Sequence, residues 1–322
     1  MTETDLAAAW GQAMNEWLAE KGRRSARTRA LYETAWHKFD AWSQGKMPWR
    51  VERKDVVEYI DWLQGELARA AVNSYLGAIR SFYAWVIDVH EPPLLREDGL
   101  PFTRNPARGI PTLTLDDTPP AWITKEEVDQ TLASIPSEGV ANLRDLALIE
   151  TLWKTAMRNT AVRSIKLTDF RWQGKDVWLR YRSKGKEGRR VFPSAAWTRV
   201  QAYLEARGRW EDMQRHLRGE KIDDDLYLFI RHTTALFDND PDRKPLTKDT
   251  IVDIVIRRTG AANLPNGAKY RPHAIRHGRA HYLDKMGYKL QDISEYLGHA
   301  SVQMTMRYLR SMDDKTRDLA DI

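Results

Sequence analysis

The chain has 322 residues and a mass of 37.4 kDa, which is enough for one large domain or two medium domains. It contains no cysteine, so disulfide bonds, cysteine–zinc sites and thiol catalysis are excluded. A formal net charge of +6 and a pI of about 9.3 favour a polyanionic partner such as a nucleic acid.

Residues 1–22 carry acidic side chains and no apolar core, so they predict neither a signal peptide nor a membrane anchor. No run of about 18 apolar residues occurs in the sequence, so no membrane span is expected. The lack of cysteine suits a reducing compartment. We therefore expect a cytoplasmic protein.

Four segments with helical periodicity fill the first third of the chain. They are residues 5–21, a segment that Ser25 can cap, residues 55–67 and residues 70–89. Their aromatic residues predict a packed helical core. The arginines and lysines on the other faces are either ordinary solvated charges or contacts to DNA phosphates.

Seven prolines between residues 91 and 120 prevent a regular helix in this segment. We place a stiff interdomain linker at about residues 110–120. The predicted domains are residues 1–112 and 113–322.

Thr124 and Glu127 have the spacing of a capping box, which predicts a helix through about Ile135. Residues 142–157 predict a second, largely buried helix. A compact second domain is expected to form around these helices.

The pattern after residue 170 shortens to that of β-strands. Residues 177–181 and 190–192 alternate around a basic turn, which predicts an antiparallel ribbon. Further helices are expected at residues 194–207 and 247–259, and a short strand at 226–230. The sequence thus predicts a mainly α fold with a small antiparallel β-sheet in the second domain.

Residues 270–309 contain the most informative pattern. His273 and Arg276 are three residues apart, so they share one face of a helix. His299 opens a new segment after a glycine, and Tyr308 follows nine residues later. A bidentate arginine suits a phosphate, and a phenol can act as a covalent nucleophile.

This ordered set resembles the active-site signature of the tyrosine recombinase, or phage integrase, family. That family has a His-x-x-Arg box, a Leu-Gly-His box and a nucleophilic tyrosine about nine residues further on. The segment Thr155-Ala-Met-Arg158 is similar to the family's first box, and the Ser-Lys-Gly-Lys segment at 183–186 is similar to its Gly-Lys-Gly turn. The combined spacing is specific, whereas any one of these motifs alone would be weak.

The resemblance implies that Tyr308 attacks a DNA phosphodiester and forms a 3′-phosphotyrosyl link. Arg158 and Arg276 would stabilise the charge on the phosphoryl oxygens, and His299 would hydrogen-bond a nonbridging oxygen. These assignments are implied by the family and not by the spacing alone.

The resemblance also implies which groups move protons. His273 would accept or relay the phenol proton, and Lys184 would protonate the departing 5′ oxygen. Lys186 competes with Lys184 for this role. Alternatively, both lysines are solvated charges that steer phosphates.

The family architecture implies a helical, SAM-like core-binding domain followed by a catalytic domain, which together clamp DNA. It implies double-stranded DNA with specific recombination sites as the partner, four protomers on two duplexes, and a Holliday junction. Accessory proteins are compatible with this organisation. No cofactor, metal or ATP is expected, and a DNA-bound protein would be associated with the nucleoid.

The sequence departs from the family at two positions. The first box often continues Arg-x-x-Glu, but position 161 is alanine, so this carboxylate is missing or is supplied from elsewhere. Position 156 is alanine where glycine is usual. Asp169 matches the family and is interpreted as structural. His277 and His281 have a spacing that zinc could use, but no third ligand is evident.

Two other functions fit part of this pattern. A type IB topoisomerase-like enzyme would use the same covalent chemistry without exchanging strands between sites. A DNA-binding regulator with a degenerate active site would bind without cleaving. The helical first domain disfavours the topoisomerase, and the full set of basic groups with Tyr308 disfavours the regulator.

Overall fold

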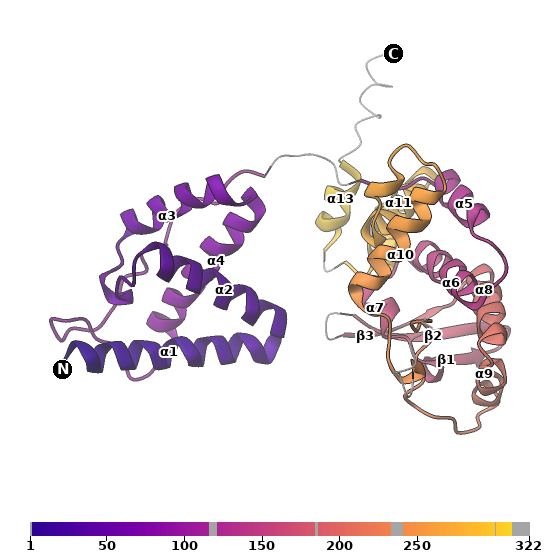
Figure 1. Cartoon of the computed structure of the whole chain (residues 1–322), viewed down its shortest axis with the longest axis horizontal. Coiled ribbons are helices and arrows are strands. Elements are labelled where there is room, and N and C mark those ends of the chain that lie inside the picture. The colour runs from indigo at the N-terminus through magenta and orange to yellow at the C-terminus, as the bar shows by residue number, and fades with distance from the viewer. Residues whose placement is uncertain (1, 116–120, 184–185, 233–240, 300, 311–322) are drawn as a thin grey trace, which may run out of the picture. The chain divides into compact units, whose positions relative to one another are not determined.

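The computed structural model describes residues 2–115, 121–183, 186–232, 241–299 and 301–310. The chain divides into two compact units, Met1–Asp117 and Thr118–Ile322 (Figure 1). Each unit has its own hydrophobic core. The predicted fold class is confirmed, because the described elements are mainly helices with one three-stranded antiparallel sheet. None of the described helices combines the length and apolar composition needed to cross a membrane.

The first unit contains four helices, which are α1 (Glu3–Arg24), α2 (Ala26–Trp42), α3 (Arg53–Glu66) and α4 (Arg69–Asp88). Its core is aromatic: the Trp10 ring meets the Phe102 ring edge-on at 4.9 Å, and Trp17 packs against Phe82 at 5.3 Å. Ser25 caps α2 as expected, since its hydroxyl accepts from the Thr28 backbone N–H at 3.2 Å.

The proline-rich segment after α4 is fastened to that helix by side-chain hydrogen bonds. The Asn73 amide accepts from the backbone N–H of Leu113 at 2.7 Å and donates to its carbonyl at 2.8 Å. Arg80 donates to the carbonyl oxygens of Ala107 and Ile110. These bonds satisfy backbone groups that the prolines keep out of regular structure. The domain boundary at residues 112 and 113 stays a prediction.

The second unit contains nine described helices and one sheet (Figure 1). The sheet has the order β1-β2-β3 and is antiparallel throughout. Four short 3-10 segments lie at Pro48–Arg50 in the first unit and at Leu167–Asp169, Pro241–Arg243 and Gly267–Lys269 in the second. The helices and strands of the second unit are α5 (Lys125–Ser134), α6 (Val140–Thr155), α7 (Asn159–Arg163), β1 (Phe170–Gln173), β2 (Asp176–Ser183), β3 (Lys186–Val191), α8 (Ser194–Ala206), α9 (Trp210–Leu217), α10 (Lys248–Ala261), α11 (Pro272–Lys285), α12 (Leu290–Leu297) and α13 (Val302–Arg310).

Helix α6 runs through the core of the second unit and is buried on nearly all sides. The predicted capping box of α5 is confirmed: the Thr124 hydroxyl accepts from the Glu127 N–H at 3.1 Å, and the Glu127 carboxylate accepts from the Thr124 N–H at 2.8 Å. The same carboxylate accepts from the Tyr270 hydroxyl at 2.9 Å, which ties α5 to the segment that precedes α11.

Two expectations for the middle of the second unit differ from the structure. The strand expected at 226–230 is wrong, because its backbone groups bond several irregular segments and form only isolated bridges, Lys166 with Tyr227 and Ile230 with Pro245. Helix α9 was not expected. Its apolar residues Trp210, Met213 and Leu217 do have helical spacing, but eight residues are too short a window for this periodicity to stand out.

Candidate active site

Two tight turns at the ends of helices form the framework of the candidate site. The first turn comprises residues 155–158, where α6 ends and Ala156 adopts a left-handed conformation with φ of 49°. The second turn comprises residues 296–299, where α12 ends and Gly298 has φ of 64°. The family's usual glycine at position 156 has a physical reason, because an alanine is mildly strained in this conformation.

Arg276 joins the two turns from helix α11. Its side chain is buried, with the residue 2% exposed, and it donates to the carbonyl oxygens of Ala156 and Leu297, each at 2.6 Å. The last carbonyls of a helix lack partners within the helix and carry partial negative charge, so a guanidinium is a suitable partner for both.

Arg158 reaches the second turn from the first. Its Nη2 donates to the carbonyl oxygen of Gly298 at 3.2 Å. Arg158 and Arg276 both line a pocket of about 200 Å³. The structure therefore brings together two guanidiniums that are 118 positions apart in the sequence (276 − 158 = 118).

A third arginine at this pocket was missed by the sequence reasoning. Arg190 on β3 donates from Nη1 to the carbonyl oxygen of Thr155 and from Nη2 to that of Tyr296 at 2.9 Å. Its guanidinium also lies 4.8 Å from the ring centre of Tyr181. One signal could have revealed it: Arg190 stands two residues before Phe192, so it shares the buried face of the ribbon.

Two histidines of α11 lie edge to face beside the arginines. The rings of His273 and His277 are 4.7 Å apart. Partial burial lowers the pKa of His273 below its usual 6.5, and the positive charges of Arg276 and Arg158 lower it further. Burial lowers the pKa of His277 to about 3, and the neighbouring His273, His281 and Arg276 contribute less. Both imidazoles are therefore neutral at pH 7.

His299 follows the second turn and contacts the next helix. Its Nδ1 lies 2.7 Å from the hydroxyl oxygen of Thr305, which is fully buried on α13. The ring of His281, the other half of the zinc-type spacing, lies 4.8 Å from the Trp122 ring and is tilted by 39° to it. Among the described residues, no group of three metal-binding side chains is found.

The predicted nucleophile lies on α13, which contacts both α11 and α12. Leu309, next to Tyr308, packs against a cluster formed by Ala156, Ala280, Leu283, Ile293 and Leu297. This packing places the α13 backbone beside the two turns. The side chain of Tyr308 lies outside the described residues.

The predicted lysines lie at the end of the β2–β3 hairpin. Strand β2 ends at Ser183 and β3 begins at Lys186, and these two residues are paired. Lys184 lies outside the described residues, as does the side chain of Lys186. The choice between the two lysines stays open.

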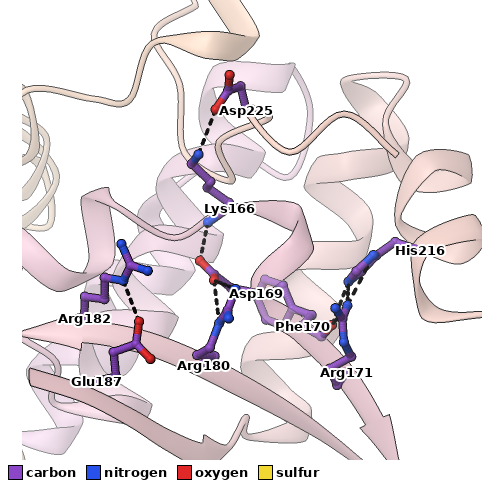
Figure 2. A network of polar contacts seen from close by, with 9 residues as sticks. All are labelled: Lys166, Asp169, Phe170, Arg171, Arg180, Arg182, Glu187, His216 and Asp225. Atoms are coloured by element: carbon purple, nitrogen blue, oxygen red, sulfur yellow. Dashed lines mark hydrogen bonds and ion pairs between the residues drawn. The ribbon is translucent and has the colours of Figure 1, made fainter. Parts of the chain in front are cut away.

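Position 161, where the family often has a carboxylate, is a buried alanine in this chain. Ala161 is buried at the edge of the pocket, and Glu187 of β3 lines the same pocket. Figure 2 shows Glu187 accepting from Arg182 across the β2–β3 pair, at 2.8 Å. Along the β2–β3 pair, Glu187 and Arg182 alternate with Gly188 and Tyr181, so they lie on the face of the ribbon opposite to Arg190, and the Glu187 carboxylate is directed to Arg182.

Asp169 has the structural surroundings that its interpretation implies. Its carboxylate accepts from the backbone N–H of Lys166 at 2.9 Å and from the guanidinium of Arg180 at 3.4 Å (Figure 2). The ammonium of Lys166 in turn binds Asp225 at 2.8 Å. These contacts fix the entry into β1 and do not reach the arginine pocket.

Comparisons with known proteins agree with this geometry. Residues 121–315 match the model of the phage integrase family, and residues 13–90 match the phage integrase N-terminal SAM-like domain. The tyrosine recombinase XerD of Listeria monocytogenes is 26% identical over 314 residues, covering 94% of this chain and 93% of its own length. The tyrosine recombinase XerC of Pediococcus pentosaceus is 26% identical over 271 residues, covering 83% and 80%.

Solved structures show the same fold at lower identity. The XerH site-specific recombinase bound to difH in a post-cleavage complex has a TM-score of 0.71 at 18% identity, covering 91% of this chain and 79% of that one. The Tn1549 transposon integrase in complex with transposon right-end DNA has a TM-score of 0.65 at 16% identity, covering 96% and 98%. The chain belongs to the phage integrase family of tyrosine recombinases, in agreement with the resemblance of its motifs to that family.

Proposed function

We propose that this protein is a site-specific DNA recombinase that cleaves and rejoins strands through a 3′-phosphotyrosyl intermediate and a Holliday junction. The observation that carries the proposal is the meeting of Arg158 and Arg276 in one pocket, next to the helix that bears Tyr308. Double-stranded DNA with specific sites is the proposed substrate, and four protomers would act on two duplexes. The domains at 1–112 and 113–322 would clamp it.

The arginines would bind the scissile phosphate. Its nonbridging oxygens are negative and repel a nucleophile, and further charge develops on them as the bond to the leaving group breaks. Two guanidiniums held in place by helix-terminal carbonyls need little reorganisation to stabilise that charge. Since these cations are supplied by the protein, the reaction would need neither a metal nor ATP, and cleavage is expected to persist in EDTA.

The cleavage step conserves the phosphodiester. The Tyr308 oxygen forms a bond to phosphorus while the bond from phosphorus to the 5′ oxygen breaks. His273 would take the phenol proton, directly or through water, because its lowered pKa keeps it neutral and able to accept. Lys184, or Lys186 in its place, would give a proton to the departing 5′ oxygen. The 5′ hydroxyl of the partner strand then reverses the step.

His299 would complete the set by donating to a nonbridging oxygen. The short contact to Thr305 fits a hydroxyl that donates to Nδ1, which leaves the proton of the neutral ring on Nε2. An Nε2–H donor can bind a phosphate oxygen without adding positive charge beside the arginines.

The relatives support DNA as the partner. The solved XerH and Tn1549 integrase complexes contain difH substrate and transposon DNA, respectively. The net charge of +6 of this chain is favourable for a polyanion. The target sequence can be found by selecting bound duplexes from a random pool.

A nicked suicide duplex carrying the selected site tests the proposal. The wild-type protein is expected to form a covalent protein–DNA adduct, and Tyr308→Phe is expected to bind the duplex without forming one. Binding without an adduct by the wild-type protein would favour a regulator. Relaxation of a supercoiled plasmid that lacks the site would favour a topoisomerase-like enzyme.

A 5′-thio leaving group identifies the general acid, because a thiolate leaves without a proton. Lys184→Ala is expected to be slow on the ordinary duplex and restored on the thio duplex. If the thio duplex restores cleavage by Lys186→Ala and not by Lys184→Ala, the general acid is Lys186.

A further inference from the structure

We propose that Arg190 is a positioning residue of this active site, a role that rests on the proposed function. It would hold the first and second turns in the spacing at which Arg158 and Arg276 share a phosphate. Its place on the sheet, its contacts and the pattern of bonds around it carry this inference.

The register of the ribbon turns Arg190 inward. Arg190 pairs with Leu179 of β2, so their side chains lie on the same face of the sheet, and Leu179 is fully buried. The neighbouring Arg189 pairs with Arg180 and is exposed on the other face. A charged side chain on the inner face requires partners, since burying an uncompensated charge is costly.

The partners of Arg190 belong to the two turns. Its guanidinium donates to the Thr155 carbonyl oxygen and, at 2.9 Å, to the Tyr296 carbonyl oxygen. Arg276 donates to the very next carbonyl oxygens in both turns, those of Ala156 and Leu297. Two guanidiniums therefore bridge the same pair of helix ends side by side, and Arg158 adds a bond to Gly298.

Aromatic rings fix the plane of the Arg190 guanidinium. It lies 4.8 Å from the ring centre of Tyr181 and 5.1 Å from that of Tyr296, and it donates to the Tyr181 hydroxyl at 3.2 Å. Gly188 makes room for this arrangement, because a Cβ there would lie 2.7 Å from the Tyr181 ring. A lysine would keep the charge but could not present two donors in one plane.

The consequence for the chemistry is specific. Removing Arg190 takes one of the two bridges away from the turns that hold Arg158 and Arg276, and small displacements of such groups slow reactions strongly. DNA affinity depends on many contacts and should change little. The defect would lie in stabilising the phosphoryl charge and not in protonating the leaving group.

Single-turnover cleavage of the suicide duplex tests this, with Arg189→Ala as the matched control on the same strand. Arg190→Ala is expected to lower the rate at saturating DNA by a factor of about 10 to 100, with less than about a threefold change in the DNA concentration for half-maximal rate. Arg190→Lys is expected to be slowed at least about tenfold. Arg189→Ala is expected to cleave at the wild-type rate. A wild-type rate for Arg190→Lys overturns the inference.

The 5′-thio duplex separates positioning of the arginines from loss of the general acid. Arg190→Ala and Arg190→Lys are expected to stay slow on it, whereas the variant that lacks the general acid is restored. Restoration of either Arg190 variant contradicts the proposed role, because it would place the defect in leaving-group protonation.

Hydrogen exchange supplies a readout that does not depend on the reaction. The backbone amides of Ala156 and Gly298 donate to Leu152 and Glu295 at 3.0 and 2.9 Å, so they report opening of the two turns. Peptides covering both turns should exchange about tenfold faster in Arg190→Lys than in Arg189→Ala. If exchange in Arg190→Lys equals that in Arg189→Ala, the inference is overturned. If the wild-type protein forms no covalent adduct with the suicide duplex, that result counts against the proposed function alone.

Discussion

At the scale of single residues, Thr305 connects α13, the helix that carries the proposed nucleophile, to His299. Thr305→Val keeps the shape of the side chain but removes the hydroxyl that contacts Nδ1. We expect cleavage of the suicide duplex to slow by about 10-fold to 100-fold, by analogy with the loss of a hydrogen-bond partner that orients a metal-binding histidine. Thr305→Ser keeps the hydroxyl and serves as the control. Equal rates for both variants would show that the contact has no part in catalysis.

His277 makes the stability of the second unit depend on pH. Its pKa is about 3 in the folded chain and 6.5 in the reference state, so the unfolded chain binds the proton more readily. The contribution of neutral His277 to the free energy of unfolding is fully present above pH 6.5. It is lost as the pH falls toward 3, by up to about 1.4 kcal/mol per pH unit.

The variant His277→Gln removes this titration. Acidification below pH 6.5 is expected to lower the free energy of unfolding of the wild type more than that of the variant. Denaturant titrations at several pH values measure this difference, in which the titrations of groups distant from His277 cancel. A difference that stays constant on acidification contradicts the prediction.

The sequence predicted the order and type of the signature residues but not what supports them. Arg158 and Arg276 could be found because their motifs have fixed local spacing. The inward face of Arg190 could be inferred from strand alternation, but its bond to a backbone carbonyl 106 positions away could not. The contact of Thr305 with a ring nitrogen in a turn could not be inferred either. Such contacts depend on tertiary structure, and local periodicity does not report them.

At the scale of elements, Gly278 sets how closely α11 approaches the segment before α5. A Cβ at this position would lie 1.8 Å from the Ile123 carbonyl oxygen, so Gly278→Ala must displace backbone. We expect it to lower the free energy of unfolding by about 1 to 3 kcal/mol, although alanine favours helices.

Gly260 provides the matched control in α10, because nothing lies within 4 Å of a Cβ built there. Gly260→Ala is expected to raise the free energy of unfolding by up to about 1 kcal/mol. Denaturant titration of both variants measures their free energies of unfolding. If both alanines stabilise, the close approach of α11 to Ile123 is not as described.

Elements with strong periodicity and caps were predictable, whereas those defined by long-range contacts were not. Helices α4, α5 and α10 begin within a residue or two of their expected starts, since propensity, capping and amphipathic pattern agree there. Residues 226–230 read as a strand because they are apolar, but the surrounding fold buries them as irregular chain. Apolar runs of this length report burial and not conformation.

At the scale of the whole molecule, the two cores are made from separate stretches of sequence. The buried residues of the first core lie between Leu6 and Ile110, and those of the largest second-unit core lie between Ile123 and Ile275. Units with independent cores can unfold separately. We therefore expect calorimetry of the full chain to resolve two transitions.

The destabilised Gly278→Ala variant assigns those transitions. Its substitution lies in the second unit, so one transition should move to lower temperature while the other stays in place. A single transition that moves as a whole would mean that the units fold as one cooperative body, contrary to the prediction.

Arg158, Arg190 and Arg276 all donate hydrogen bonds to backbone carbonyl oxygens, and this affects how a form of the protein that binds DNA without cleaving it should be made. Each guanidinium holds backbone as well as facing the pocket, so replacing one alters the shape of the site together with its charge. A decoy that occupies recombination sites and blocks them should therefore be built at Tyr308. Loss of one phenolic oxygen leaves the arginine scaffold intact, and such a decoy would compete with the active protein on equal terms.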